Sequence, residues 1–206
     1  MCGIAGVLHL TNDAPVETAT VQQMLGMLRH RGPDGWGIYV GRGMGLGNTR
    51  LSIIDLSSGD QPIGNEDGTL WIVFNGEIFN YVELRPKLEA RGHRFTTHSD
   101  TEVILHLYED YGPDCLRELN GQFAIAIWDA RKRQLFLARD RLGVRPLFYT
   151  LNAGRLVFGS EVKCLLTVPR VRAKIDPEAL DEVFTYWSVL PPRTIFHDIQ
   201  QLPPGH

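Results

Sequence analysis

Two neighbouring apolar segments, residues 123–128 and 135–138, constrain the fold of this chain more than any other feature. Both are apolar at every position (FAIAIW and LFLA), whereas a strand with one solvated face alternates apolar and polar residues. These two strands are therefore covered on both faces. Only residues 129–134 separate them, a hairpin-length connection that favours antiparallel pairing. The sequence predicts an α+β fold in which antiparallel sheets pack face to face, with helices outside.

The remaining elements are expected from hydrophobic periodicity and turn residues. Strands are expected at residues 3–10, 36–40, 45–54, 70–74, 145–149 and 155–159. Helices are expected at residues 16–28, 80–91, 100–111, 161–167 and 177–186. Pro86 should kink or shorten the second of these helices, and Ser99–Glu102 forms a capping box for the third. Asn75-Gly76 is a common hairpin signal and predicts a tight turn.

The character of the chain changes after about Pro169. In this chain of 206 residues, the part before Pro169 carries the regular strand and helix patterns. The last part holds one expected helix and is otherwise irregular, with several prolines. We therefore assign residues 1–168 to one domain and residues 169–206 to a linker and the start of a further, C-terminal domain.

Charge and cysteine content exclude several classes of function. A net charge of −3 and a pI near 6.2 give no sign of a nucleic-acid or membrane partner. Cys2, Cys115 and Cys164 lack metal-ligand or redox spacing, which argues against disulfides and for a reducing compartment. The histidines show no metal-binding motif, so no metal site is expected. Without a secretory signal or a membrane-length apolar segment, the expected location is the cytoplasm.

Cys2 is the first candidate for chemistry. Aminopeptidases remove an initiator Met when the next residue is small, so the mature chain would begin with cysteine. One residue then carries a nucleophilic thiol and an α-amine of pKa about 7.7–8.0, which can act as a general base. If Met1 is retained, that nitrogen is a peptide amide and the base is lost. The alternative is that Cys2 is an incidental small residue.

Asn75-Gly76-Glu77 is the second candidate. Acyl transfer needs donors that point at the developing oxyanion, and an Asn side chain with a Gly backbone N–H supplies two. A simple Asn-Gly turn is the competing interpretation, and without other evidence it is favoured.

Arg50 and Asp100 together suit an amino-acid substrate. An Arg can hold an α-carboxylate through two parallel hydrogen bonds. Asp100, in the first turn of a capped helix, can receive an α-ammonium group or merely complement the helix dipole. Each alone is better explained as a surface charge than as a ligand. His30 and Arg31 lie in a Gly/Pro-rich segment that is either a mobile lid or an ordinary connecting loop.

The sequence resembles the N-terminal glutaminase domain of glutamine-hydrolysing asparagine synthetases, which are class II (N-terminal-nucleophile) amidotransferases. The resemblance covers essentially the whole chain and follows the family's order of motifs. After Arg50 comes Leu-Ser-Ile-Ile-Asp, as in asparagine synthetases, whereas sugar-phosphate relatives carry Trp-x-Thr-His there. The motifs are MCGIAGV (1–7), RHRGPDGWG (29–37), TRLSIIDLSSGDQP (49–62), FNGEIFNY (74–81), SDTEVI (99–104), FAIAIWD (123–129), RDRLGVRPLFY (139–149) and FGSEVK (158–163).

This resemblance implies a four-layer α/β/β/α sandwich, the N-terminal-nucleophile hydrolase fold. It implies hydrolysis of L-glutamine to glutamate and ammonia through a thioester on Cys2. It also implies a role for each of the other site residues. Asn75 and Gly76 would form the oxyanion hole, Arg50 would hold the substrate carboxylate, Asp100 and Glu77 would surround the substrate amine, and the backbone of Leu51, Ser52, Ile53 and Ile54 would line the pocket.

The resemblance also implies partners. The ammonia would serve ATP-dependent synthesis of asparagine from aspartate in a C-terminal domain, which would bind the ATP and Mg; no cofactor is expected in the present domain. A homodimer is one further expectation. Two other hypotheses stay open: the same glutaminase chemistry serving a different acceptor, and a non-catalytic scaffold of the same fold.

Overall fold

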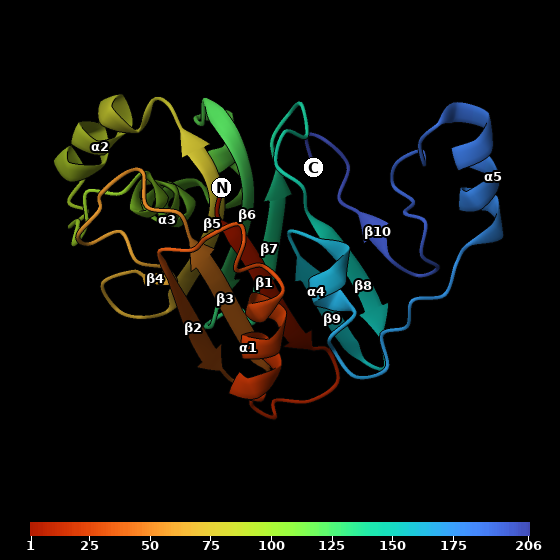
Figure 1. The fold of residues 1–206 in the computed structure, drawn as a ribbon. Coiled ribbons are helices and arrows are strands. Elements are labelled where there is room, and N and C mark those ends of the chain that lie inside the picture. Colours follow the sequence, from red (N-terminus) through yellow and green to blue (C-terminus); the bar gives the residue numbers. More distant parts are fainter.

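The computed structural model describes all residues 1–206 and contains two antiparallel sheets (Figure 1). The first sheet has six strands in the order β10-β8-β9-β1-β3-β2, and the second has four in the order β4-β5-β6-β7. The strands of the first sheet are β1 (Gly3–His9), β2 (Gly35–Gly41), β3 (Met44–Arg50), β8 (Phe148–Asn152), β9 (Arg155–Gly159) and β10 (Gln200–Gln201). Those of the second are β4 (Ile63–Gly64), β5 (Leu70–Ile78), β6 (Gly121–Asp129) and β7 (Gln134–Arg139).

Three apolar clusters separate four layers. One cluster fills the space between the sheets, a second lies between the four-stranded sheet and its helices, and a third lies between the six-stranded sheet and its helices. This arrangement is the α/β/β/α sandwich expected from the sequence. The helices are α1 (Thr18–Gly26), α2 (Tyr81–Ala90), α3 (Asp100–Tyr111), the 3₁₀ helix η1 (Gly112–Arg117), α4 (Val162–Leu165) and α5 (Pro177–Tyr186).

The β6–β7 hairpin explains the continuous apolar segments. The strands pair antiparallel, with Ala124 opposite Arg139 and Asp129 opposite Gln134, which confirms the expectation. Ile125 and Ile127 pack toward the helical layer. Ala124, Ala126 and Trp128 pack toward the other sheet. Because each face meets an apolar layer, no position along the strand tolerates a solvated side chain.

Two expected strand ends were wrong. The strand expected to reach residue 54 ends at Arg50, and Ile53 beyond it is 67% exposed. The tight turn expected at Asn75-Gly76 is absent, because β5 continues to Ile78 and both residues pair with β6. Gly76 is needed there for a different reason: a Cβ would lie 2.1 Å from the Gln122 carbonyl oxygen.

Two helix expectations hold in part. Pro86 lies inside α2 without shortening it; Val82, whose carbonyl loses its helical partner at Pro86, is 61% exposed and open to water. Ser99 caps α3 by accepting from the Thr101 N–H. Glu102 does not complete the capping box, because its carboxylate accepts instead from residues 96 and 97.

The C-terminal stretch is more ordered than the sequence indicated. β10 adds a strand beside β8, and the buried Ile199 joins the cluster under the six-stranded sheet. α5 stands apart from the layers, at the right of Figure 1. The expected strand at 145–149 begins only at Phe148. The domain boundary after residue 168 stays a prediction. No helix of the structure has the length and apolar content to cross a membrane.

Candidate active site

The Cys2 thiol lies against the loop that follows β3. The Leu51 N–H donates to Cys2 Sγ (3.4 Å), and Sγ donates to the Leu51 carbonyl (3.6 Å). Cys2 directly precedes β1, which is an interior strand hydrogen-bonded to β3 and β9. Chain termini usually fray unless a sheet holds them, and here pairing begins at Gly3, opposite Thr49. The thiol is therefore fixed from both sides.

An ion-pair cluster anchors the backbone of Cys2. Arg31 Nε donates to the Cys2 carbonyl (2.9 Å), and Arg31 Nη1 pairs with Glu161 (2.9 Å). His30 and Lys163 also contact the Glu161 carboxylate, each at 2.9 Å. Burial raises the pKa of Glu161, but these three hydrogen bonds outweigh it and lower the pKa to about 2. Sequence reasoning missed this anchoring role, although it singled out residues 30 and 31.

Arg50 organises the loop beside the thiol. Its side chain is 7% exposed and pairs with the exposed Asp60 (2.6 Å). It also donates to the carbonyls of Ile54 (3.2 Å) and Asp55. These contacts use three of the five N–H donors of the guanidinium. Two donors are left to receive a carboxylate.

Asn75 carries the most unusual polar group of the site. Its side chain is 1% exposed, and neither its amide nitrogen nor its amide oxygen has a hydrogen-bond partner. Buried polar groups nearly always have partners, because an unsatisfied one costs about 1–3 kcal/mol. Asn75 lines the same pocket as Cys2. An orphaned donor beside a nucleophile has the character of an oxyanion-binding group.

Asp100 also lines this pocket. It begins α3, is 4% exposed, and accepts from the Ile78 N–H (3.0 Å). Burial raises the pKa of its carboxyl, with the charge of Glu77 adding to the increase, although hydrogen bonds from Ile78, Ser99 and Thr101 act in the other direction. Two carboxylates close together in a buried site favour a cationic ligand.

Nine of the ten site residues expected from the sequence line one pocket. Ser52 is the exception: it is not among the lining residues, and its N–H donates to Asp34 Oδ2 (2.8 Å). The nine are Cys2, Arg50, Leu51, Ile53, Ile54, Asn75, Gly76, Glu77 and Asp100. These residues are far apart in the sequence. They meet because the residues just before β1, the end of β3, the second half of β5 and the start of α3 all line this pocket.

Two further polar residues line the pocket and were missed by sequence reasoning. The buried Gln61 accepts from the Phe74 N–H (2.6 Å) and donates to Thr101 (3.2 Å), so it ties β5 to α3 on either side of Asn75. Arg145 has a buried Nε without a partner. Burial, together with the charge of Arg31, lowers the pKa of Arg145. It belongs to one of the family motifs, which is the signal that pointed to it.

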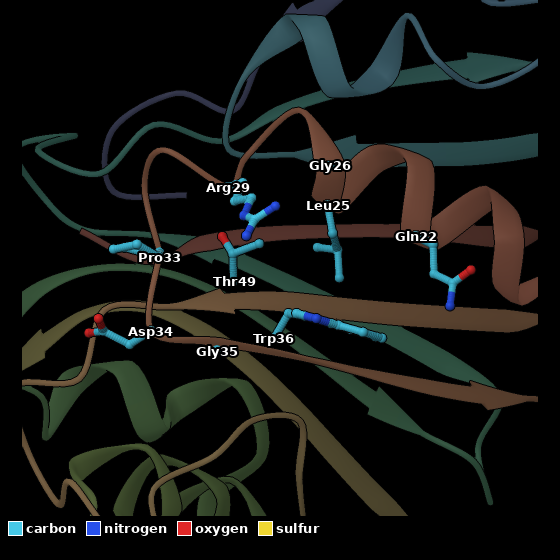
Figure 2. A pocket seen from close by; sticks show the side chains of 10 residues that line it. Gln22, Leu25, Gly26, Arg29, Pro33, Asp34, Gly35, Trp36 and Thr49 are labelled. Atoms are coloured by element: carbon cyan, nitrogen blue, oxygen red, sulfur yellow. The ribbon is translucent and has the colours of Figure 1, made fainter.

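A larger cavity lies beside this pocket, between α1 and the start of β2 (Figure 2). Its volume is about 540 Å³, against about 70 Å³ for the pocket that contains Cys2. Asp34 lines the larger cavity and accepts from the Ser52 N–H, which belongs to the loop whose neighbouring residues line the Cys2 pocket. We assign the chemistry to the smaller one, because it holds the thiol and the orphaned amide.

Comparison with known proteins agrees with this geometry. The whole chain, residues 1–206, matches the model of the glutamine amidotransferase domain. The chain belongs to this family. Two solved structures share its fold: glutamine phosphoribosylpyrophosphate amidotransferase from B. subtilis (TM-score 0.64, 24% identity, 79% of this chain and 42% of that one) and the allosteric regulatory enzyme of purine biosynthesis (TM-score 0.65, 24% identity, 80% and 43%). The chain thus has the N-terminal-nucleophile hydrolase fold.

The curated relatives that match this chain include glutamine-hydrolysing asparagine synthetases. Asparagine synthetase 3 of Bacillus subtilis is 40% identical over the whole chain, and asparagine synthetase 1 of the same organism is 42% identical, again over the whole chain. Asparagine synthetase 1 of Arabidopsis thaliana is 43% identical over 80% of the chain. The chain spans only 34%, 33% and 28% of these relatives' lengths. It corresponds to their glutaminase half, which confirms the resemblance seen in the sequence.

Proposed function

We propose that this glutamine amidotransferase domain hydrolyses L-glutamine to L-glutamate and ammonia through a thioester on Cys2. The orphaned amide of Asn75, buried in the pocket that holds the Cys2 thiol, carries the proposal. A polar group left without a partner in a folded protein needs an explanation. A tetrahedral oxyanion formed at the thiol supplies one.

Removal of Met1 would activate the site in two ways. While Met1 is attached, the nitrogen of Cys2 is a peptide amide and cannot accept a proton. Its removal creates an α-amine with an ordinary pKa of about 7.7–8.0, which suits a general base at neutral pH. Met1 also lines the pocket, where Arg145 contacts its sulfur. Its loss therefore enlarges a pocket that is small in the unprocessed chain.

The reaction then has two halves. In the first, the amine takes the thiol proton while Sγ of Cys2 attacks the side-chain carbonyl carbon of glutamine. Asn75 Nδ2 and the Gly76 N–H stabilise the oxyanion; the ammonium returns its proton to the leaving nitrogen, and ammonia departs. In the second half, the same amine takes a proton from water, which attacks the thioester, and glutamate leaves as the thiol is restored.

Charge selects the substrate in this scheme. Arg50 would bind the α-carboxylate through the donors that Asp60 and the loop carbonyls leave free. Asp100 and Glu77 would receive the α-ammonium group. The backbone of Leu51, Ile53 and Ile54 would line the side-chain channel, as the pocket geometry supports. Ser52 would contribute indirectly, because the hydrogen bond from its N–H to Asp34 holds the loop that contains Leu51, Ile53 and Ile54.

The ammonia would serve ATP-dependent amidation of aspartate to asparagine in a synthetase domain. The names of the relatives at 40–42% identity support this acceptor. The ATP and its Mg would bind in that other domain, and this one would need no cofactor for glutamine hydrolysis. A cytoplasmic location and a homodimer stay predictions from the sequence.

Intact-mass analysis with a glutamine-like electrophile, diazo-oxo-norleucine, tests the nucleophile. We expect loss of one methionine and a single adduct on Cys2 that excess glutamine blocks. The Cys2→Ala variant, whose side chain fills the same place without sulfur, is the matched control and should take no adduct. A processed chain that takes none would contradict the proposal and favour the scaffold alternative.

Isotope transfer tests the acceptor separately. A form that carries the synthetase domain would be given amide-¹⁵N-glutamine, ATP and aspartate. We expect the label in the side-chain amide of asparagine. Labelled ammonia without labelled asparagine, or label in another acceptor, would contradict asparagine as product while leaving the glutaminase intact.

A further inference from the structure

Folding brings two histidines and several carboxylates together on the outer face of α3. Glu66 comes from the turn between β4 and β5, His93 follows α2, and His106 lies in the second half of α3. One ligand atom from each of these three lies within 4.8 Å of the others. No spacing motif announces the cluster, because its members are 27 and 13 residues apart in the chain.

A fourth group, Glu109, completes the cluster. His106 Nδ1 lies 2.7 Å from Glu109 Oε2 and 3.9 Å from Glu66 Oε2. His93 Nδ1 lies 3.4 Å from the same Glu109 oxygen. Nitrogen and oxygen ligands bind Zn²⁺ at about 2.0–2.2 Å, so tetrahedral ligands stand about 3.4 Å apart. These three separations are within about 1 Å of that spacing, and the ligand atoms of Glu66, His93 and His106 all lie within 4.8 Å of one another.

Both imidazoles are oriented as metal ligands usually are. Each presents Nδ1 to the cluster and Nε2 away from it: His93 Nε2 contacts Asp110 (3.0 Å), whereas the buried His106 Nε2 faces Glu102 at 3.8 Å, beyond hydrogen-bond distance. A ligating histidine commonly gives its other N–H to a carboxylate, which fixes the ring and its tautomer. Here the outer carboxylate is itself fixed, because Glu102 accepts four hydrogen bonds from residues 96 and 97.

Burial distinguishes this cluster from an ordinary group of surface charges. The His106 side chain is 1% exposed and that of His93 is 14% exposed. Glu66, at 38%, is the member open to solvent and offers an ion its way in. Buried histidines that converge with carboxylates form the donor set preferred by zinc and related late first-row ions.

We propose that Glu66, His93, His106 and Glu109 bind one divalent transition-metal ion of the zinc class. The site differs from the sequence expectation of no metal in this domain. Its role is structural: it ties the β4–β5 turn and the end of α2 to α3. The first residue of α3, Asp100, lies in the Cys2 pocket, about 9 Å along the helix axis from His106. The metal would hold this helix in place without contacting the substrate.

The competing arrangement is a metal-free ionic network. Burial lowers the pKa of His106, but the facing carboxylates of Glu102 and Glu109 outweigh it and raise the pKa to about 9. A proton on His106 would then take the place of the metal among the carboxylates. The two arrangements differ in whether the chain retains a stoichiometric metal ion.

Equilibrium binding of Zn²⁺ to the chelator-treated chain tests the proposal. The measurement uses the Cys2→Ala background, so that the accessible thiol cannot bind the ion. We expect one saturable site per chain and a rise in melting temperature with added Zn²⁺. His93→Ala should abolish both effects. Asp110→Asn, which removes the outer carboxylate charge from His93 and from Arg91, should weaken binding by up to about 10–100-fold.

Two controls make the result decisive. His197→Ala removes a 46%-exposed histidine elsewhere on the surface and should leave binding unchanged. Glu66→Gln keeps the size of the solvent-facing ligand and should weaken binding in a chain that still folds. Absence of saturable binding, or binding unaffected by both His93→Ala and Glu66→Gln, would overturn the proposal and favour the metal-free network. Neither outcome bears on glutamine hydrolysis, which is measured separately.

Discussion

The Cys2 thiol contacts both backbone polar groups of Leu51, with the Leu51 N–H at 3.4 Å and its carbonyl at 3.6 Å from the sulfur. The thiol thus has a fixed position before any substrate arrives. Leu51 itself is held indirectly, because Arg50 binds the carbonyls of the loop that follows. Pre-organisation of the nucleophile is therefore built into backbone geometry, and the predictions below concern the groups that support it.

Asn75→Ala should remove most of the activity and little of the stability. Loss of one oxyanion donor typically lowers kcat by about 10²–10³-fold, or 2.7–4 kcal/mol. The amide of Asn75 makes no hydrogen bond in the folded chain, so its removal leaves no partner unsatisfied. Steady-state glutaminase kinetics measure the loss of activity, and a thermal melt of the same sample measures the change in stability. An unchanged kcat would remove Asn75 from the mechanism.

Gly76→Ala should destabilise the fold itself. The added Cβ would lie 2.1 Å from the Gln122 carbonyl oxygen, which is backbone of the paired strand β6 and cannot rotate away. Overpacking of this kind costs roughly 1–3 kcal/mol, and each kcal/mol lowers the Tm by about 2–4 °C in a chain of this size. Calorimetry measures the change.

Gly26→Ala is the matched control for this substitution. Gly26 ends α1 and has no atom within 4 Å of its would-be Cβ. Alanine is the better helix former by about 0.8–1 kcal/mol in a helix interior, so this variant should be as stable as the parent or more so. If both variants melt alike, the close approach of Gln122 does not determine the choice of glycine.

Arg50→Lys should raise KM for glutamine more than it lowers kcat. A lysine ammonium cannot present the planar fork that binds a carboxylate. Hydrogen bonds to charged groups are worth about 1.5–3 kcal/mol, which corresponds to roughly 10–100-fold in KM. Asp60→Asn is the control, since Asp60 is 83% exposed and contacts the guanidinium through Nη1 alone. A fall in kcat at constant KM would contradict a carboxylate-binding role.

Glu161→Gln should make stability less dependent on acid pH. The folded pKa of Glu161 is about 2, below the ordinary 4.5. A group with a depressed pKa contributes stability above its unfolded pKa, and that contribution is lost as pH falls from about 4.5 toward 2. Urea unfolding should therefore show the variant weaker at pH 7 and equal to the parent near pH 2. Glu83→Gln, at an exposed position of α2, should show no such convergence.

The layered fold was accessible from the sequence because its cause is local. Strands such as 123–128 and 135–138 meet an apolar layer on each face, so every position in them carries an apolar residue. The sequence misplaced Asn75 and Gly76 because the same dipeptide serves a tight turn in one context and a close strand contact in another. What decides is the Gln122 carbonyl on β6, a residue 46 positions from Gly76 that local pattern does not reveal.

The candidate site divides in the same way. The family motifs brought in Cys2, Arg50 and Asp100, since each lies in a compact segment. Gln61 and Arg145 also lie inside family motifs, but their contacts are with strands and helices far along the chain, so the motifs alone did not indicate a place in the pocket. Likewise His93 and His106 meet only after α2 folds back on α3.

The position of Cys2, one residue ahead of an interior strand, limits how this molecule can be elongated or labelled. A polypeptide joined in front of the cysteine would occupy the pocket that Met1 lines and would convert the required amine into an amide. Any precursor with such a leader must be cut at one specific bond to gain activity. An uncleaved amino-terminal affinity tag would abolish glutamine hydrolysis while leaving the fold intact. Affinity tags for purification therefore belong at the C-terminus.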